Sequence, residues 1–284
     1  MTDLSTPATS RRTFLQQMAL GAGTVMVSGA WRFDFGAPEG ALIDAVAAAC
    51  RRLGPLGWTR MLKDATGGAL DIEARDLAGQ LAKPLRVDRS YPGFGDFDTA
   101  GTRGIEPGAP DRSLLYHAFA SPGVYATRTG TLGGFPTLAE IEAVENYVYG
   151  VRPPTLDQLR ARARGNPLGI VVFALQYRNT PNSVHGRHAE LCFSRTGMAR
   201  IGTIGPQYDA RTRGFEGVDP ARPFEFRVVP QRFAAYVAMK APGQAGNFGP
   251  QDALACDGQL NFWVPLHKLF NGRECIAGTD VVLE

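Results

Sequence analysis

The side chains with the greatest capacity for chemistry in this sequence are four histidines, and two of them lie close together. His185 and His188 are followed by Glu190 and Cys192 in the segment HGRHAELC. If residues 188–192 form a strand, residues 188, 190 and 192 share one face, because alternate side chains point the same way. Imidazole, carboxylate and thiolate groups bind copper, zinc and iron. The spacing therefore gives one hypothesis, a copper, zinc or iron site.

His267 could complete such a site from far along the chain, where it lies in the segment FWVPLHKLF. A second interpretation assigns these side chains to strand edges, where they satisfy the backbone groups of nearby loops. We favour the second interpretation, because H-x-x-H between a loop and a strand specifies no metal family. The fourth histidine, His117, lies in SLLYHAFA. We expect it to have a structural role, hydrogen-bonded to a loop of residues 84–110.

Signatures of other chemistry are missing from the sequence. There is no G-x-S-x-G elbow, no phosphate-binding loop and no dinucleotide-binding glycine pattern. The Gly- and Arg-rich segment 194–214 has four arginines that either face an anionic ligand or lie in solvent on two strands and a turn. We favour solvated arginines for this set, which comprises Arg195, Arg200, Arg211 and Arg213.

Helical signals dominate the first half of the chain. Apolar residues recur at helical spacing in residues 38–53, and Gly54-Pro55 should end that helix. Residues 110–120 combine a proline in the first turn with an apolar stripe, which predicts another helix. The segment 84–110 is rich in Gly, Pro and Asp and predicts a long loop.

Two capping boxes predict where two further helices begin. Thr137 pairs with Glu140 at the start of a helix over residues 137–149, and Thr155 pairs with Gln158 at the start of the next helix. In each box the threonine side chain accepts a hydrogen bond from the backbone of the third helical residue, and the Glu or Gln side chain bonds back to the threonine backbone.

From about residue 166 the hydrophobic period changes to that of strands. PLGIVVFALQYR is rich in branched side chains and predicts a buried strand. In HAELCFS one set of alternate residues is apolar (Ala189, Leu191 and Phe193), which is typical of a strand. The segments PFEFRVV and RFAAYVAM are also rich in residues that favour strands. The predicted fold class is α+β, with a helical part over residues 31–150, a linker helix over 151–166 and a strand-rich part over 167–284.

Composition limits the classes of function. The chain has 284 residues and a formal net charge of +3, which argues against a strongly basic nucleic-acid-binding protein. The four cysteines, at positions 50, 192, 256 and 275, include no C-x-x-C, so neither a zinc ribbon nor a thioredoxin motif is present. One disulfide and four buried thiols both remain open.

The N-terminal residues have the layout of an export signal. The segment SRRTFL (residues 10–15) precedes an apolar run from Met18 to Val27 that is too short for a spanning helix of about 20 residues. SRRTFL resembles the twin-arginine (Tat) motif, in which Arg11 and Arg12 are read by the Tat translocase. The resemblance implies a signal peptide over residues 1–30, a periplasmic or secreted protein and no stable membrane span. An uncleaved membrane tether is the alternative.

Two segments of the helical part resemble the second half of a bacterial cytochrome c-type domain. They are GTRGIEPGAPDRSLLYHAFASP (residues 101–122) and FPTLAEIEAVENYVYG (residues 135–150). The resemblance implies a helical scaffold over residues 31–150. Haem c attachment, however, needs C-x-x-C-H, and this region has Cys50 alone. An axial methionine is also missing, because GGFP (residues 133–136) stands where it usually lies, so we expect no haem c.

Two functions fit these observations. One is an exported binding or accessory protein whose helical part docks to a redox protein while the strand-rich part recognises a ligand or a second protein. The other is a metal-dependent oxidoreductase that uses His185, His188, Glu190 and His267 as ligands and receives its metal before export. We favour the first, because no recognisable catalytic set accompanies the candidate ligands.

Overall fold

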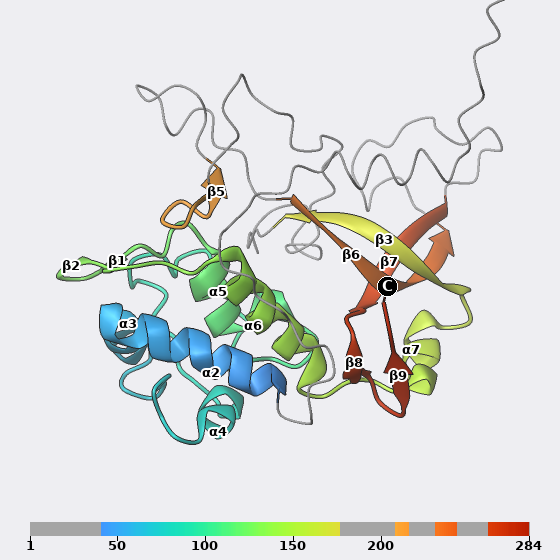
Figure 1. Ribbon diagram of the computed structural model, residues 1–284, viewed down its shortest axis with the longest axis horizontal. Coiled ribbons are helices and arrows are strands. Elements are labelled where there is room, and N and C mark those ends of the chain that lie inside the picture. Colours follow the sequence, from blue (N-terminus) through green and yellow to red (C-terminus); the bar gives the residue numbers. More distant parts are fainter. Residues whose placement is uncertain (1–40, 177–207, 216–230, 243–260, 284) are drawn as a thin grey trace, which may run out of the picture. The chain divides into compact units, whose positions relative to one another are not determined.

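The computed structural model describes residues 41–176, 208–215, 231–242 and 261–283. Helices and strands both contribute, so the mixed α+β class predicted from the sequence is confirmed (Figure 1). The α-helices are α2 (Ala41–Leu53), α3 (Trp58–Ala65), α4 (Leu77–Ala82), α5 (Leu114–Ala120), α6 (Leu138–Gly150) and α7 (Leu156–Ala163). Short 3-10 helices, η1 (Gly54–Leu56) and η2 (Pro110–Arg112), precede α3 and α5. Within the described ranges, no helix has the length and apolar composition needed to cross a membrane.

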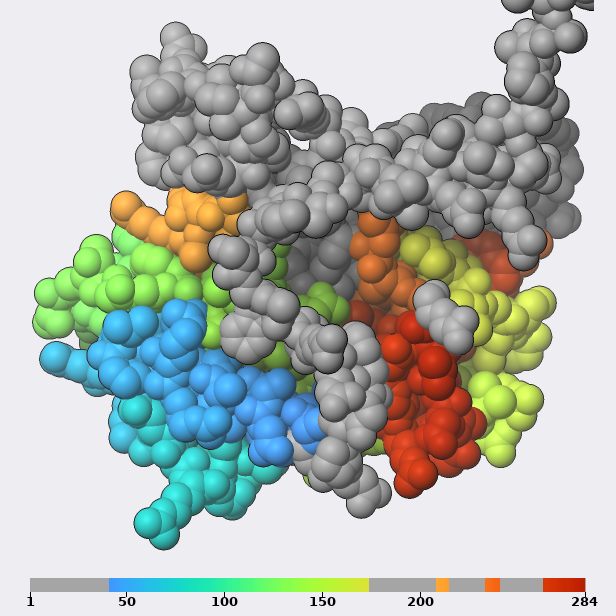
Figure 2. All heavy atoms as spheres, viewed as in Figure 1, coloured from blue at the N-terminus to red at the C-terminus, as the bar shows by residue number. Residues whose placement is uncertain are grey.

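Helix α2 packs against α6, which also contacts α5 (Figure 1). The predicted stripe of α2 is buried at Val46, Ala49, Cys50 and Leu53. Atoms of this helix form part of the surface drawn in blue in Figure 2. Arg51 is among the exposed residues of α2. Burial of one face against α6 stabilises α2 more than helix propensity does, because tertiary packing supplies most of the stability of short helices.

Both predicted capping boxes are present. Thr137 and Glu140 exchange hydrogen bonds at the start of α6, and Thr155 and Gln158 do so at the start of α7. Each box satisfies two backbone N–H groups that the first turn of a helix leaves without partners.

The predicted loop between α4 and η2 is confirmed, and hydrogen bonds fasten it to the helices. The backbone N–H of Ile105 donates to the carbonyl of Leu81 at 2.9 Å. Gly104 allows this approach, since a Cβ at that position would lie 3.0 Å from Cα of Leu81. The loop also contacts His117, as expected: Nε2 of this buried histidine lies 2.8 Å from the carbonyl oxygen of Gly93.

Three strands form an antiparallel sheet in the order β3–β6–β7. They are β3 (Leu168–Gln176), β6 (Gln231–Pro242) and β7 (Asn261–Lys268). The remaining strands form small hairpins: β1 (Ala126–Thr127) with β2 (Gly130–Thr131), β4 (Tyr208–Asp209) with β5 (Gly214–Phe215), and β8 (Gly272–Ile276) with β9 (Thr279–Val281). The segment RFAAYVAM lies in β6, whereas HAELCFS and PFEFRVV lie outside the described residues.

The predicted strand is present as β3, but it is buried on one face and not on the other. Phe173 is buried and packs edge-to-face on Tyr236 of β6. Ile170 and Val172, which point to the other face, are 70% and 64% exposed, and Phe233 of β6 is 72% exposed. Strand β3 therefore contributes one face to the core, although its sequence is apolar throughout.

The buried apolar residues form two clusters. The first runs from Val46 to Val148 and fills the helical part. The second includes Tyr149 at the end of α6, Leu159 of α7 and buried residues of the sheet and the β8 strand. Helix α7, expected as a linker, therefore buries its Leu159 within the second core.

Candidate functional site

Of the four candidate metal ligands predicted from the sequence, one lies in the described part of the protein. His185, His188 and Glu190 lie outside the described residues, as does Cys192. Only His267 can be located, on β7. Within the described ranges no group of three or more His, Cys, Asp or Glu side chains is arranged to hold a metal ion.

His267 is buried at 1% exposure, and its ring packs edge-to-face against Tyr149. Nε2 forms a short hydrogen bond with the backbone carbonyl of Cys275. Because a carbonyl only accepts, Nε2 carries the proton and Nδ1 carries the lone pair when the ring is neutral. Burial lowers the pKa of His267 to about 4, with Arg162 contributing in the same direction, so the ring is neutral at pH 7.

The next residue, Lys268, is a buried cation surrounded by polar groups of α6. Its ammonium donates to Glu145 and Asn146, each at 2.7 Å, and also to Glu142. Lys268 is 2% exposed, and the side chain of Glu145 is fully buried. The two carboxylates balance a charge that would otherwise be costly to remove from water. We call this group the Lys268 cluster; it comprises Lys268, Glu142, Glu145 and Asn146.

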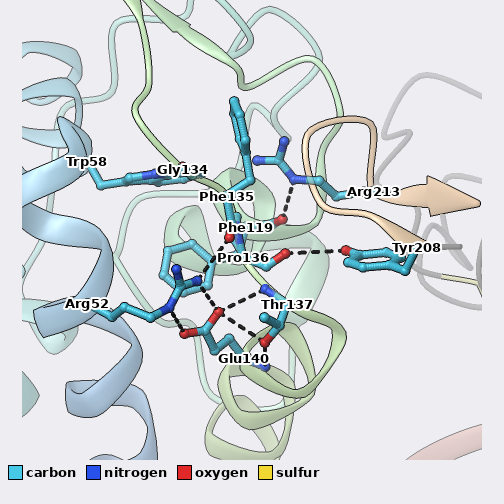
Figure 3. Close-up of polar contacts among 10 residues, drawn as sticks. All are labelled: Arg52, Trp58, Phe119, Gly134, Phe135, Pro136, Thr137, Glu140, Tyr208 and Arg213. Atoms are coloured by element: carbon cyan, nitrogen blue, oxygen red, sulfur yellow. Dashed lines mark hydrogen bonds and ion pairs between the residues drawn. The ribbon is translucent and has the colours of Figure 1, made fainter. Parts of the chain in front are cut away.

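A second concentration of polar contacts surrounds the segment GGFPT (residues 133–137), immediately before α6 (Figure 3). Nε1 of Trp58 donates to the carbonyl of Gly134 at 2.8 Å. Arg52 donates to the carbonyl of Phe135 at 2.9 Å and forms a two-pronged ion pair with Glu140. These contacts come from α2 and α3, so the segment is fixed between two helices and the start of a third.

The β4–β5 hairpin adds two side chains to the same segment. The hydroxyl of Tyr208 donates to the carbonyl of Pro136 at 3.3 Å. The side chains of Trp58, Arg52 and Tyr208 thus hold three consecutive carbonyls, those of residues 134, 135 and 136. Three consecutive carbonyls held by side chains leave this segment little freedom to move.

Arg213 is the central side chain of this region (Figure 3). It is only 2% exposed, and its guanidinium carbon lies 5.0 Å from the ring centre of Phe135 and 5.6 Å from that of Trp58. The guanidinium donates to the carbonyls of Phe119 at 3.1 Å, Val124 at 2.9 Å and Arg211 at 2.7 Å. No ion pair of Arg213 is found among the described residues. Burial lowers its pKa to about 10, so the charge persists at pH 7.

This arrangement, which we call the Arg213 cluster, is formed by Arg213, Trp58, Phe119, Val124 and Phe135. Carbonyl oxygens and aromatic faces stabilise its cation in place of a carboxylate. The expectation that Arg213 is solvated is therefore wrong. At the described end of the segment 194–214, β4 pairs with β5 around a turn. Residues 194–207 lie outside the described ranges, so the two strands and turn expected over the whole segment stay a prediction. Arg211 does lie at the surface, above the ring of Tyr125. Arg195 and Arg200 fall outside the described residues.

The cysteines that the structure describes are both free thiols. Cys50 lies in the helical core, and Cys275 lies in β8, where its sulfur accepts a hydrogen bond from the backbone N–H of Phe270. Burial raises their pKa to about 12 and about 11 respectively, so neither is a thiolate at neutral pH. Cys192 and Cys256 lie outside the described residues, so the choice between one disulfide and four buried thiols stays a prediction.

Comparisons with known proteins identify no relative. No protein-family profile matches the chain. No curated protein sequence and no solved structure is significantly similar to it.

Proposed function

We propose that this chain is an exported bacterial binding or accessory protein. Its helical part, residues 31–150, is a cytochrome c-like scaffold without haem that docks to a redox protein. Its strand-rich part recognises a ligand or a second protein. Nucleic acid is not a partner in this proposal, which agrees with the low net charge of +3.

The observation that carries the proposal is the environment of GGFPT. In the cytochrome c-type domains that the sequence resembles, an axial methionine usually lies just before the last helix. In this chain GGFPT lies at that position. Trp58, Arg52 and Tyr208 donate hydrogen bonds to three of its backbone carbonyls, and the guanidinium of Arg213 lies over the ring of Phe135. These contacts support a structural role for the segment in place of haem binding, because the carbonyls of residues 134, 135 and 136 all accept hydrogen bonds from side chains of the protein.

The export part of the proposal rests on Arg11 and Arg12. We propose that the Tat translocase carries the chain to the periplasm or beyond, and that the signal is then cleaved near residue 30 or retained as a membrane tether. Replacing both arginines by lysine should retain the chain in the cytoplasm, as measured by cell fractionation. Arg32→Lys is the matched control, and unchanged export of the double variant would contradict this part.

A metal-dependent oxidoreductase is the second candidate, and the geometry of His267 favours it. Metal-bound histidines usually donate their other ring N–H to a carboxylate or a backbone carbonyl. His267 has such a donor arrangement toward Cys275, which leaves Nδ1 with a lone pair. His185, His188 and Glu190 would be the other ligands, for copper, zinc or iron.

Elemental analysis separates the two candidates. Full-length protein purified from the cytoplasm should contain much less than one equivalent of copper, zinc or iron and should lack a Soret band. Arg187→Ala, between the two histidines, is a control for His185→Ala and His188→Ala. One equivalent of metal that is lost in both histidine variants but kept in the control would establish the second candidate instead.

A further inference from the structure

A small cavity lies in the helical part, and none of its lining residues belongs to the Arg213 or Lys268 cluster. It has a volume of about 80 Å³ and is bounded by α4, by the loop that follows Arg103 and by the end of α6. Its walls are mostly apolar and include Leu81, Ile105, Pro107 and Val151. A cavity of this size has room for about five non-hydrogen atoms, by comparison with the space that one water needs.

The walls of the cavity are fixed relative to one another by backbone hydrogen bonds. Ile105 donates to Leu81 of α4, and Gly108 donates to Val148 of α6 at 2.8 Å. Val151 donates to Tyr147 at 2.8 Å, which continues the helical turn beneath the cavity. A ligand would therefore meet a largely preformed site, and binding would not have to order the loop.

Three polar side chains line the cavity: Arg103, Tyr147 and Arg152. Arg103 already forms an ion pair with Glu106, at 2.9 Å. Arg152 is exposed and has no ion pair or hydrogen bond within the part of the chain that the structure describes. Burial raises the pKa of Tyr147, so its hydroxyl remains a neutral donor at pH 7. Among the residues that the structure describes, Arg152 is thus a positive charge without an anionic partner, and it lies beside an apolar surface.

We propose that this cavity binds a short branched aliphatic group that carries a carboxylate. The aliphatic group packs against Leu81, Ile105 and Val151, and the carboxylate pairs with Arg152. A planar carboxylate matches the two-pronged donor geometry of a guanidinium. Glu106 already neutralises Arg103, so within the described ranges Arg152 is the cation left to pair with a ligand, which favours a monoanion over a doubly charged phosphate.

The same chemistry occurs in a free carboxylic acid and in the C-terminal residue of a peptide. This inference rests on the proposed binding role for its biological meaning. Its test, however, measures binding at the cavity alone and depends neither on export nor on metal content. If neither acid binds, the proposed function is unaffected. If elemental analysis finds one equivalent of metal, the proposed function is overturned, but this binding site is not.

The test titrates the full-length protein with 3-methylbutanoate and, separately, with a tetrapeptide that ends in leucine. Binding is followed by NMR shifts of the backbone amides of Ile105 and Val151. Each ligand has an uncharged partner, 3-methylbutanamide or the peptide amide, which should bind at least about tenfold more weakly. Arg152→Gln should weaken binding of the acids by a similar factor, whereas Arg51→Gln, an exposed arginine on α2, should not.

A second variant tests the apolar part of the site. Ala82→Phe places a ring at the rim of the cavity from an exposed position and should abolish the shifts, while Ala161→Phe on α7 should leave them unchanged. Tighter binding of the peptide would identify a protein C-terminus as the ligand, and binding of the free acid alone would identify a small molecule. No binding of either acid, equal binding of the amides, or no effect of Arg152→Gln would overturn the inference.

Discussion

The Arg213 cluster and the Lys268 cluster each bury a cation from the second half of the chain against the helical part, but they stabilise it differently. Lys268 meets two carboxylates and an amide oxygen of α6. Arg213 meets three backbone carbonyls and two aromatic rings. Both side chains are 2% exposed, so the difference is not one of burial.

The chemistry of the two cations explains the difference. A lysine ammonium is a compact, strongly hydrated charge, and its removal from water requires an opposite charge nearby. A guanidinium spreads its charge over a plane, is weakly hydrated and stacks on aromatic faces, so carbonyl oxygens and rings suffice. We therefore expect both Lys268→Arg and Arg213→Lys to lower the stability of the protein.

The largest expected effect comes from removing the charge of Lys268. Lys268→Met leaves the fully buried Glu145 without its ammonium partner, and we expect the free energy of unfolding to fall by about 3 to 5 kcal/mol. Urea unfolding measures the change. Lys240→Met, at an exposed position of β6, should change stability by less than about 0.5 kcal/mol. Equal effects of the two variants would mean that the Lys268 cluster contributes little.

Acidification should affect the Lys268 region next, because His267 lies beside it. The pKa of His267 is about 4 when folded and 6.5 in a model peptide, so the unfolded chain takes up the proton first. This contribution to stability is complete above pH 6.5 and is lost as the pH falls toward 4, by up to about 1.4 kcal/mol per pH unit. Urea unfolding of His267→Gln should show a shallower decline over that range than the unaltered chain. If the free energy of unfolding falls equally steeply with pH in both proteins, the lowered pKa of His267 is contradicted.

Arg213→Lys tests whether charge alone suffices in the aromatic cluster. Lysine keeps the charge but cannot reach the carbonyls of Phe119 and Val124 in the same geometry, so we expect a loss of about 2 kcal/mol in the free energy of unfolding. Arg211→Lys, two residues away at the surface, is the matched control for the same urea measurement. Full stability of Arg213→Lys would show that the guanidinium plane is unimportant.

The smallest effect is expected at Arg52, a cation near the Arg213 cluster that is not buried. Its side chain is 43% exposed and pairs with Glu140. Solvent screens such pairs, so Arg52→Gln should reduce the free energy of unfolding by no more than about 1 kcal/mol. Thermal unfolding of this variant beside Arg51→Gln measures the difference. A loss comparable with that of Arg213→Lys would remove the distinction between buried and exposed cations.

Sequence reasoning succeeded where the determinants are local. The capping boxes at Thr137 and Thr155 depend on residues three positions apart, and both form. His117 was expected to bond to the loop before it, and it does. The one-sided burial of β3 could not be predicted, because Ile170 and Val172 are apolar like the residues that face the core. An apolar strand sequence indicates that the strand can be buried, but it does not show whether one face or both faces are covered.

The two cation clusters were missed because their partners are distant in sequence. Arg213 bonds to carbonyls that precede it by 94 and 89 positions, and nothing in the surrounding Gly- and Arg-rich segment distinguishes it from Arg211. Lys268 was overlooked beside His267, whose residue type has more obvious chemistry. The metal site proposed at His185, His188 and Glu190 stays a prediction, because those residues lie outside the described ranges.

The separation of Lys268 from α6 also sets an order of events during synthesis. Glu145 leaves the ribosome 123 residues before the lysine that balances its charge. At typical rates of elongation this interval lasts about 6 to 25 s. During it, α6 cannot complete its contact with β7, and the strand pairing of β6 with β7 is also still to come. We propose that the Tat translocase carries this chain as folded cargo, so export must wait until β7 and also β8, which completes the second core, have been translated.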